Sequence, residues 1–348
     1  MRTYFPAVAG NRALLPKLGA EIAGGRFSHA YILEGARGFG KHTLARQIAM
    51  AAACRHRDDA AFPLPCGQCD ACRKILSGNC PDLLWFSRPT GKASLGVDVV
   101  RALKADLSLV PNELDIKILV IEDADAMTVQ AQNAFLLTLE EPPPFVLFLL
   151  LAENAGNLLE TVRSRAPVFR LCPVDDETLT DWLVQKAPPG VRQAAATLQK
   201  EKPTEFAALL RLSDGAIGRA VELLDNEKRA PLLSDRETVC TLLSALFDRK
   251  NDVLLLTLSG LSQNREAVGE LLSLFGEALR DLILLSRSET VPLLFFTDRE
   301  TAEDLAACCT LSRLLDLAAA TDTARGALAA NANIKLTLAC LFDRLSAT

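Results

Sequence analysis

A glycine-rich run at residues 35–43 carries the first candidate chemistry. It reads Gly-Ala-Arg-Gly-Phe-Gly-Lys-His-Thr and matches the phosphate-loop pattern G-x-x-x-x-G-K-[ST] up to its last position. An apolar, strand-like stretch precedes it, and apolar residues recur after it at helical spacing. Backbone N–H groups of such a loop cradle phosphate oxygens, and the lysine reaches the terminal phosphates. The alternative is a glycine-rich turn that happens to carry a lysine. The candidate nucleotide-binding residues are Gly35, Gly38, Gly40 and Lys41.

His42 occupies the position where the pattern requires a hydroxyl. A serine or threonine there ligates Mg²⁺, and this hard cation prefers oxygen to an imidazole nitrogen. Thr43 follows directly, but one residue turns a helix by about 100° and directs its hydroxyl elsewhere. Both His42 and Thr43 remain candidate nucleotide contacts. The sequence therefore predicts phosphate binding without magnesium-dependent hydrolysis.

An apolar run at residues 118–121 ends in two acids, Glu122 and Asp123. A strand that ends in carboxylates resembles a Walker B site, where one acid serves the metal and the next polarises the attacking water. The usual order is Asp-Glu, so each acid here has the wrong length by about one ångström of reach. Misplacement on that scale costs about a hundredfold in rate. The alternative is that the acids only cap the following helix.

Four cysteines between these elements form the second cluster. Cys66, Cys69 and Cys72 have the spacing C-x-x-C-x-x-C, and Cys54 lies upstream. This arrangement predicts a structural zinc site with four thiolate ligands and no open position for a substrate. Iron–sulfur ligation and four unliganded thiols are the alternatives. His56 and Cys80 are alternative ligands that could replace one of the four.

A longer pattern carries a family resemblance. Residues 127–144 predict a helix that contains Ala-Gln-Asn-Ala and ends in Glu-Glu-Pro-Pro-Pro; an apolar run and then Ser164 and Arg165 follow. Together with the phosphate loop, the cysteines and the Glu-Asp-Ala-Asp run, this order closely resembles the bacterial clamp-loader ATPase family. The resemblance covers residues 1 to about 225 and extends more weakly to the rest. It implies an AAA+ nucleotide-binding fold.

The resemblance implies a catalytic role for Arg165, beside Ser164, on a neighbouring subunit. In the family this arginine reaches the γ-phosphate bound next door, and such a residue is worth about 10³ to 10⁵ in rate. Ala166 stands where the family usually has cysteine. The alternative is that Arg163, Arg165 and Arg170 only form a solvated basic face.

Two weaker positions rest on the same resemblance. Asn154 or Glu153 falls where the family places its sensor 1 residue, after the apolar strand. Residues 215–219 resemble the sensor 2 helix, from which Arg219 could approach a bound phosphate. A single arginine in a helix is usually just solvated.

The altered phosphate loop and the reversed acids favour an assembly subunit with little or no ATP hydrolysis of its own. The resemblance implies a place in the DNA polymerase III holoenzyme, in a hetero-oligomeric ring with gamma/tau and delta subunits that acts on the sliding clamp and primed DNA. Structural zinc is the expected cofactor, and ATP or ADP is doubtful. One alternative is an active motor of the gamma/tau type. Another is an unrelated enzyme such as a nucleotide kinase, which explains neither Glu-Glu-Pro-Pro nor Ser164 and Arg165.

The predicted fold class is α/β followed by all-α, in three domains. Residues 1–172 form a parallel α/β nucleotide-binding domain with the zinc module at 54–72, residues 173–231 a helical lid, and residues 232–348 a helical collar through which subunits join.

Composition limits the remaining function classes. The net charge of −5 argues against a surface that binds DNA throughout. The first residues lack the apolar core of a secretion signal, and no apolar run approaches the length of a membrane span. Ten cysteines, four of them in a metal-like cluster, indicate a reducing compartment, so we expect a cytoplasmic protein without membrane contact.

Overall fold

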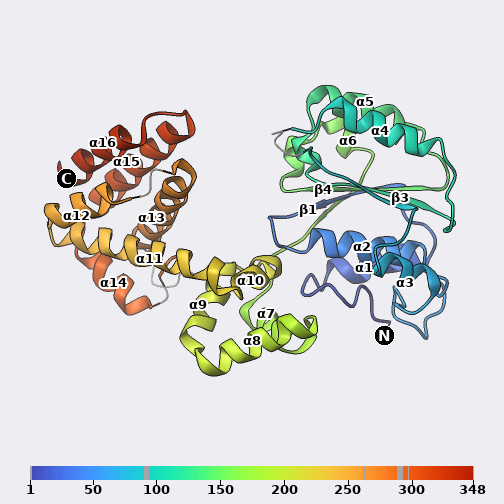
Figure 1. The fold of residues 1–348 in the computed structure, drawn as a ribbon, viewed down its shortest axis with the longest axis horizontal. Helices are drawn as coiled ribbons and strands as arrows, with labels where there is room; N and C mark the ends of the chain where they lie inside the picture. The colour runs from blue at the N-terminus through green and yellow to red at the C-terminus, as the bar shows by residue number, and fades with distance from the viewer. Residues whose placement is uncertain (1, 90–93, 262–263, 288–292, 297, 348) are drawn as a thin grey trace. The chain divides into compact units, whose positions relative to one another are not determined.

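The computed structural model describes residues 2–89, 94–261, 264–287, 293–296 and 298–347. It divides into two compact units, which Figure 1 shows as ribbons. The first unit consists of Met1–Thr197 and Gly215–Val221, and the second of Leu198–Asp214 and Glu222–Thr348. The expected three-domain division stays a prediction, and its limit at residue 231 falls inside a continuous helix.

A parallel sheet forms the centre of the first unit. Its spatial order in the described chain is β2-β3-β4-β1-β5. Ile121 of β3 is level with Leu150 of β4, and Leu33 of β1 with Leu151, so the loops after these strands start at one edge of the sheet. Polar side chains far apart in the sequence can therefore meet there. The strands are β1 (Ala30–Glu34), β2 (Leu83–Phe86), β3 (Lys117–Ile121), β4 (Val146–Ala152) and β5 (Val168–Arg170).

Helices cover both faces of this sheet (Figure 1). The strands β1, β3 and β4 are apolar throughout or nearly so because both faces are buried. Tyr31 and Leu33 pack with one helix layer, while Ile32 packs with the other. One layer is α1 (Leu14–Ala23), α2 (Lys41–Ala52) and α3 (Asp70–Leu76); the other is α4 (Val97–Leu107), α5 (Val129–Glu140) and α6 (Glu160–Arg163).

The expected helix before the prolines is α5. The hydroxyl of Thr128 caps it by accepting the N–H of Ala131, and it ends at Glu140, directly before Glu141 and the proline run. The remaining elements of this part of the chain are η1 (Ala124–Ala126), η2 (Ala155–Asn157), α7 (Asp176–Asp181), η3 (Trp182–Lys186), α8 (Pro189–Glu201) and α10 (Ile217–Leu223).

The second unit is helical in its described residues, as the sequence predicted for residues 232–348. Leu272, Phe275 and Leu279 of α13 are fully or almost fully buried in its core. Asp281 of the same helix is buried too, and its carboxylate accepts the N–H groups of residues 294–296. The helices are α9 (Pro203–Ser213), α11 (Asn226–Phe247), α12 (Asn251–Ser259), α13 (Arg265–Leu285), α14 (Arg299–Ala307), α15 (Leu311–Ala329) and α16 (Ile334–Ala347).

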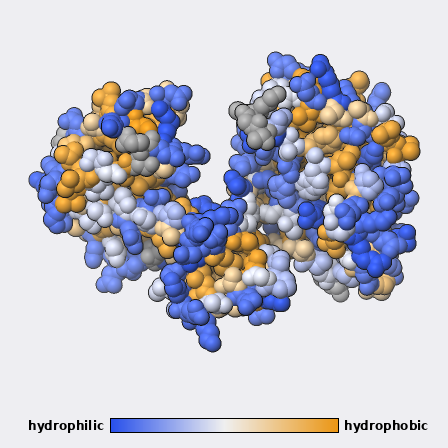
Figure 2. All heavy atoms as spheres, in the orientation of Figure 1, coloured by the Kyte–Doolittle hydropathy of each residue, from blue (hydrophilic) through white to orange (hydrophobic). Residues whose placement is uncertain are grey.

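The surface mixes polar and apolar residues. Figure 2 shows hydrophilic residues over much of the visible face, with hydrophobic patches between them. Within the described ranges, no helix combines the length and the apolar character needed to cross a membrane.

Candidate functional site

The phosphate loop joins β1 to α2, as the sequence predicted. Gly38 and Gly40 have φ values of +85° and +90°, which side chains other than glycine rarely adopt. Lys41 begins α2 and is only 8% exposed. Its ammonium group donates hydrogen bonds to the carbonyl oxygens of Gly35 at 2.5 Å and Ala36 at 3.2 Å. Burial lowers the pKa of Lys41, against the opposing charges of nearby acids. The lysine is therefore turned back onto its own loop.

The start of α10 packs directly on this loop. The Gly218 N–H donates to the Gly38 carbonyl oxygen at 2.9 Å. A Cβ atom added to Gly38 would lie 3.0 Å from the Arg219 backbone nitrogen and 3.2 Å from the Ala216 Cβ atom. The backbone of Arg219 thus lies beside the loop, but its side chain is exposed. Its contact with a phosphate stays a prediction.

His42 pairs with the first acid after β3. Its Nε2 atom lies 3.1 Å from Glu122 Oε1, and its ring stacks on Trp85 of β2 with centroids 5.7 Å apart and planes 9° apart. Thr43 is exposed. The histidine that replaces the expected hydroxyl therefore contacts the carboxylate expected to serve a metal.

The second acid also has a basic partner. Asp123 Oδ2 accepts a hydrogen bond from Arg88 Nε at 3.0 Å, and Arg88 Nη2 lies 2.9 Å from the same oxygen in an ion pair. Asp123 precedes η1, but its side chain makes no cap hydrogen bond, so the capping alternative does not describe it. The partner could have been found from topology. Phe86 and Ile121 are level in the paired strands, and Arg88 and Asp123 each follow their strand by two residues.

Asp125 and Asn154 arrange the loop after β4. The Asp125 carboxylate accepts the N–H groups of Glu153 at 3.2 Å and Asn154 at 3.1 Å. The Asn154 side chain in turn accepts the N–H of Gly156 at 2.8 Å. These bonds order the loop, and the choice of Asn154 or Glu153 as a nucleotide sensor stays a prediction.

Arg165 lies after α6 and has its own set of partners. Its Nη2 atom lies 2.6 Å from Glu140 Oε1, and Nη1 donates to the Thr161 carbonyl at 2.8 Å and the Ser164 hydroxyl at 3.3 Å. The side chains of Arg165 and Glu140 are 34% and 44% exposed. Arg170 pairs instead with Glu34. The sequence did not single out Glu140 as a partner, although it belongs to the Glu-Glu-Pro-Pro pattern.

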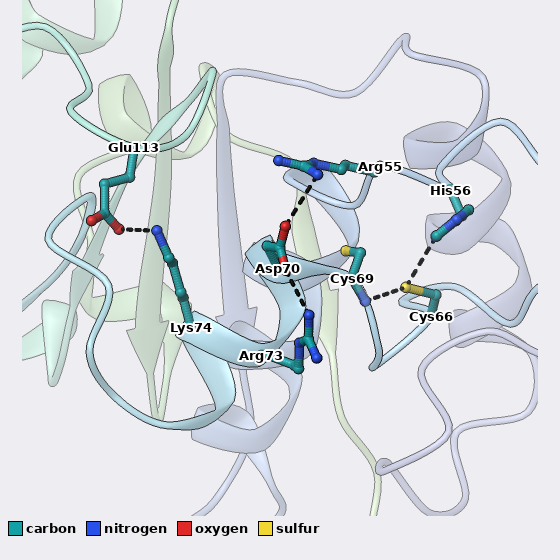
Figure 3. Close-up of polar contacts among 8 residues, drawn as sticks. All are labelled: Arg55, His56, Cys66, Cys69, Asp70, Arg73, Lys74 and Glu113. Carbon is teal, nitrogen blue, oxygen red and sulfur yellow. Dashed lines mark hydrogen bonds and ion pairs between the residues drawn. The ribbon is translucent and has the colours of Figure 1, made fainter.

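The cysteine insert brings most of its predicted ligands together. The candidate ligand atoms of Cys54, His56, Cys66 and Cys69 all lie within 4.8 Å of one another. Figure 3 shows His56 directed toward Cys66, with 3.4 Å between Nδ1 and Sγ. The Cys69 N–H donates to the same sulfur at 3.4 Å. Cys72, the fourth predicted ligand, is adjacent, with its sulfur 3.9 Å from that of Cys66.

These donors suit zinc. Soft thiolates with imidazole are a usual tetrahedral set, and bonds of about 2.3 Å to sulfur and 2.0 Å to nitrogen imply S–S edges of about 3.8 Å and N–S edges of about 3.5 Å. Burial raises the pKa of Cys69, but hydrogen bonds from its neighbours outweigh burial and lower that pKa to about 7. Burial raises the pKa values of Cys54 and Cys72. A bound cation would stabilise the buried thiolates and hold the insert together.

Comparison with known proteins finds relatives among the subunits of DNA polymerase III. A family model described as "DNA polymerase III, delta subunit" matches residues 10–175. The delta' subunit of Yersinia pestis is 31% identical over 74% of this chain and 71% of its own length. The tau/gamma subunit of Haemophilus influenzae is 29% identical over 71% of this chain, but the match spans only 34% of that subunit.

One solved structure is similar along almost the whole chain. A gamma subunit-related protein from Thermotoga maritima aligns at 17% identity with a TM-score of 0.42, covering 96% of this chain and 99% of its own. The parallel sheet with its phosphate loop after β1 has the AAA+ architecture that the sequence predicted. On the identity and coverage of its delta' relative, the chain belongs to the DNA polymerase III clamp-loader family, which includes the delta' and tau/gamma subunits.

Proposed function

We propose that this chain is a delta'-type clamp-loader subunit that hydrolyses little or no ATP and supplies Arg165 to a neighbouring motor subunit. The observation that carries this proposal is that both acids after β3 are engaged by bases of the chain itself. Glu122 contacts His42, and Asp123 accepts a hydrogen bond from Arg88 Nε and forms an ion pair with its guanidinium. An active ATPase of this class needs these two positions for Mg²⁺ and for the attacking water.

The charges around the site also disfavour a metal. A divalent cation at Asp123 would lie next to the Arg88 guanidinium, and like charges at such short range repel. His42 supplies no hydroxyl, and its ring is held between Glu122 and Trp85. A nucleotide could still contact Lys41 if the ammonium group exchanged its carbonyl partners for phosphate oxygens.

Arg165 has the properties of an arginine that acts on a neighbour. Its guanidinium is partly exposed, and Glu140, Thr161 and Ser164 hold it in one orientation. A planar guanidinium binds phosphate oxygens through two parallel hydrogen bonds, which lysine cannot do. The pair with Glu140 is at the surface and contributes about 1 kcal/mol at most, so a phosphate can displace the carboxylate.

The proposed setting is a hetero-oligomeric ring with gamma/tau and delta subunits that places the sliding clamp on primed DNA. Membership of the clamp-loader family supports this setting. The competing candidate is an active gamma/tau-type motor, which the similarity to tau/gamma subunits also suggests.

ATP turnover by the isolated chain separates these candidates. We expect no magnesium-dependent turnover above background, because neither acid is available to the metal. The His42→Thr variant, measured alongside, shows whether restoring the hydroxyl is sufficient for activity. Robust turnover by the wild-type chain would make it a motor.

Arg165 is tested separately in the reconstituted loader. Arg165→Ala should leave assembly intact and lower turnover at the site it faces by about 10³. Arg163→Ala is the matched control, because Arg163 is an exposed arginine at the end of α6. Unchanged turnover with Arg165→Ala would remove its assigned role while leaving the other conclusions intact.

A further inference from the structure

A pocket of about 360 Å³ in the second unit is lined by side chains of α11, of α14 and of residues 295–296. This volume is at the small end of the range for ligand sites, which is about 300 to 1,000 Å³. Phe295, Phe296 and Leu305 supply apolar walls, and Arg236 supplies a cation. Apolar walls with a few polar groups are the usual composition of a binding pocket.

Arg236 is half-buried in this pocket without an anionic partner. Its Cζ atom lies 4.4 Å from the centre of the Phe295 ring, a cation–π contact. Its guanidinium makes no hydrogen bond or ion pair with any residue that the structure describes. Burial lowers the pKa of Arg236, but the side chain of an arginine stays charged in proteins. Its five N–H donors are therefore left for water or for a ligand.

The aromatic wall of the pocket is held in place from α13. The buried carboxylate of Asp281 accepts the N–H groups of Leu294 at 3.1 Å, Phe295 at 2.7 Å and Phe296 at 3.3 Å. The rings of Phe295 and Phe296 also pack edge to face, with centroids 5.1 Å apart. A wall that is already ordered lowers the entropic cost of binding a ligand against it.

Two acids at the pocket restrict the kind of anion that Arg236 can bind. The carboxylate of Asp298 caps α14 by accepting the N–H and the hydroxyl of Thr301, at 3.1 Å and 2.6 Å. Asp304 also lines the pocket and is exposed. These two negative charges repel a polyanion such as nucleic acid. A ligand with a single carboxylate gains the guanidinium contact and brings no further negative charge toward the acids.

We propose that this pocket binds the C-terminal residue of a partner protein, with the carboxylate on Arg236 and an apolar side chain against Phe296 and Leu305. A guanidinium binds a carboxylate through two parallel hydrogen bonds. In a C-terminal residue the carboxylate and the side chain branch from one Cα atom, so both fit a small pocket while the chain leaves in one direction. Ser244, two helical turns from Arg236 on α11, supplies a hydroxyl for the peptide group. This site does not depend on ATP hydrolysis or on Arg165.

The test compares small acids with their amides on the full wild-type chain. The probes are N-acetyl-phenylalanine and N-acetyl-leucine, each with a free carboxylate and as the uncharged amide, titrated into the protein and followed by NMR. We expect both acids to shift the amide signals of Phe295 and Phe296, and the amides to bind about tenfold more weakly because they lack the charge-assisted hydrogen bonds. Equal affinity of acid and amide would overturn the proposal, as would no binding of either acid at millimolar concentration. This comparison needs no variant and so does not depend on whether a substitution folds.

A variant and a competitor add a second readout. Arg236→Met keeps an unbranched apolar stem over Phe295 but removes the charge, so it should weaken binding of the acids about tenfold and leave binding of the amides unchanged. Arg325→Ala is the matched control, because Arg325 pairs with Asp322 on α15 and does not line this pocket. If a single-stranded oligonucleotide displaces N-acetyl-phenylalanine, the pocket is a nucleic-acid site and the proposed peptide ligand is wrong.

Discussion

The two candidate ion sites of the first unit differ in what their ligands contact. After β3, Glu122 lies 3.1 Å from the imidazole of His42, and Asp123 forms an ion pair with the Arg88 guanidinium. In the cysteine insert, by contrast, the donors contact one another, and burial makes an isolated thiolate costly there. The two acids after β3 therefore already have basic partners, whereas the donors of the insert lie close enough together to hold a cation. Residue types alone do not distinguish these two sites, because the side chains next to the candidate ligands determine whether a cation can bind.

Metal removal should produce the largest effect. Stripping zinc with a chelator should lower the free energy of unfolding by about 4 kcal/mol, because metal binding to the native state is part of its folding free energy. Thermal unfolding with and without chelator measures this change. Cys66→Ala should reproduce it, and Cys172→Ala, which alters an exposed thiol, should not. If protein purified without chelator contains no zinc, the prediction that the cysteine insert binds this metal is wrong.

Gly38→Ala should destabilise the protein, because the phosphate loop packs against the start of α10. The residue has a φ of +85°, and the new Cβ would lie 3.0 Å from the Arg219 nitrogen. We expect a loss of about 2 kcal/mol in urea unfolding, from backbone strain and crowding against α10. Gly190→Ala is the control, because that residue has open space around it. An unchanged midpoint would show that the loop and α10 separate easily.

Removing the side chains of His42 and Arg88 should allow Glu122 and Asp123 to bind Mg²⁺ together with ATP. We expect the affinity of wild-type chain for ATP to be the same with Mg²⁺ as with EDTA. In the double variant His42→Thr, Arg88→Ala, Mg²⁺ should tighten ATP binding about tenfold, or about 1.4 kcal/mol, as measured by calorimetry. Arg101→Ala, which removes an arginine paired with Asp98 on α4, should have no effect. If Mg²⁺ does not change the ATP affinity of the double variant either, the reversed order of Glu122 and Asp123 is by itself enough to prevent metal binding.

Glu140→Gln should have the smallest effect on stability. Both partners of the Arg165 pair are partly exposed, so its loss should change the free energy of unfolding by about 0.5 kcal/mol. Denaturant unfolding beside a Glu141→Gln control measures this. A loss above about 2 kcal/mol would show that Glu140 is a structural anchor, and Arg165 would then not be free to exchange it for a phosphate.

The sequence predicted the elements of the fold better than the contacts within the sites. The phosphate loop between β1 and α2 and the helix that ends at Glu140 follow from local periodicity, glycine and proline. Trp85, Arg88 and Glu140 were not predicted as partners, because the contacts of Trp85 with His42, of Arg88 with Asp123 and of Glu140 with Arg165 join residues far apart in the chain. His56 was named only as an alternative ligand, because its contact with Cys66 arises from the fold of the insert.

Residue types and spacing by themselves determined the family pattern, the missing hydroxyl at His42 and the reversed order of Glu122 and Asp123, because each is a property of consecutive residues. Only the tertiary structure decided which charges meet. Strand order and register place Arg88 beside Asp123, and the fold of the insert places His56 beside Cys66. Electrostatic and metal-ligand contacts act over a few ångströms, and residues distant in the sequence reach that range only when the sheet and its loops have formed.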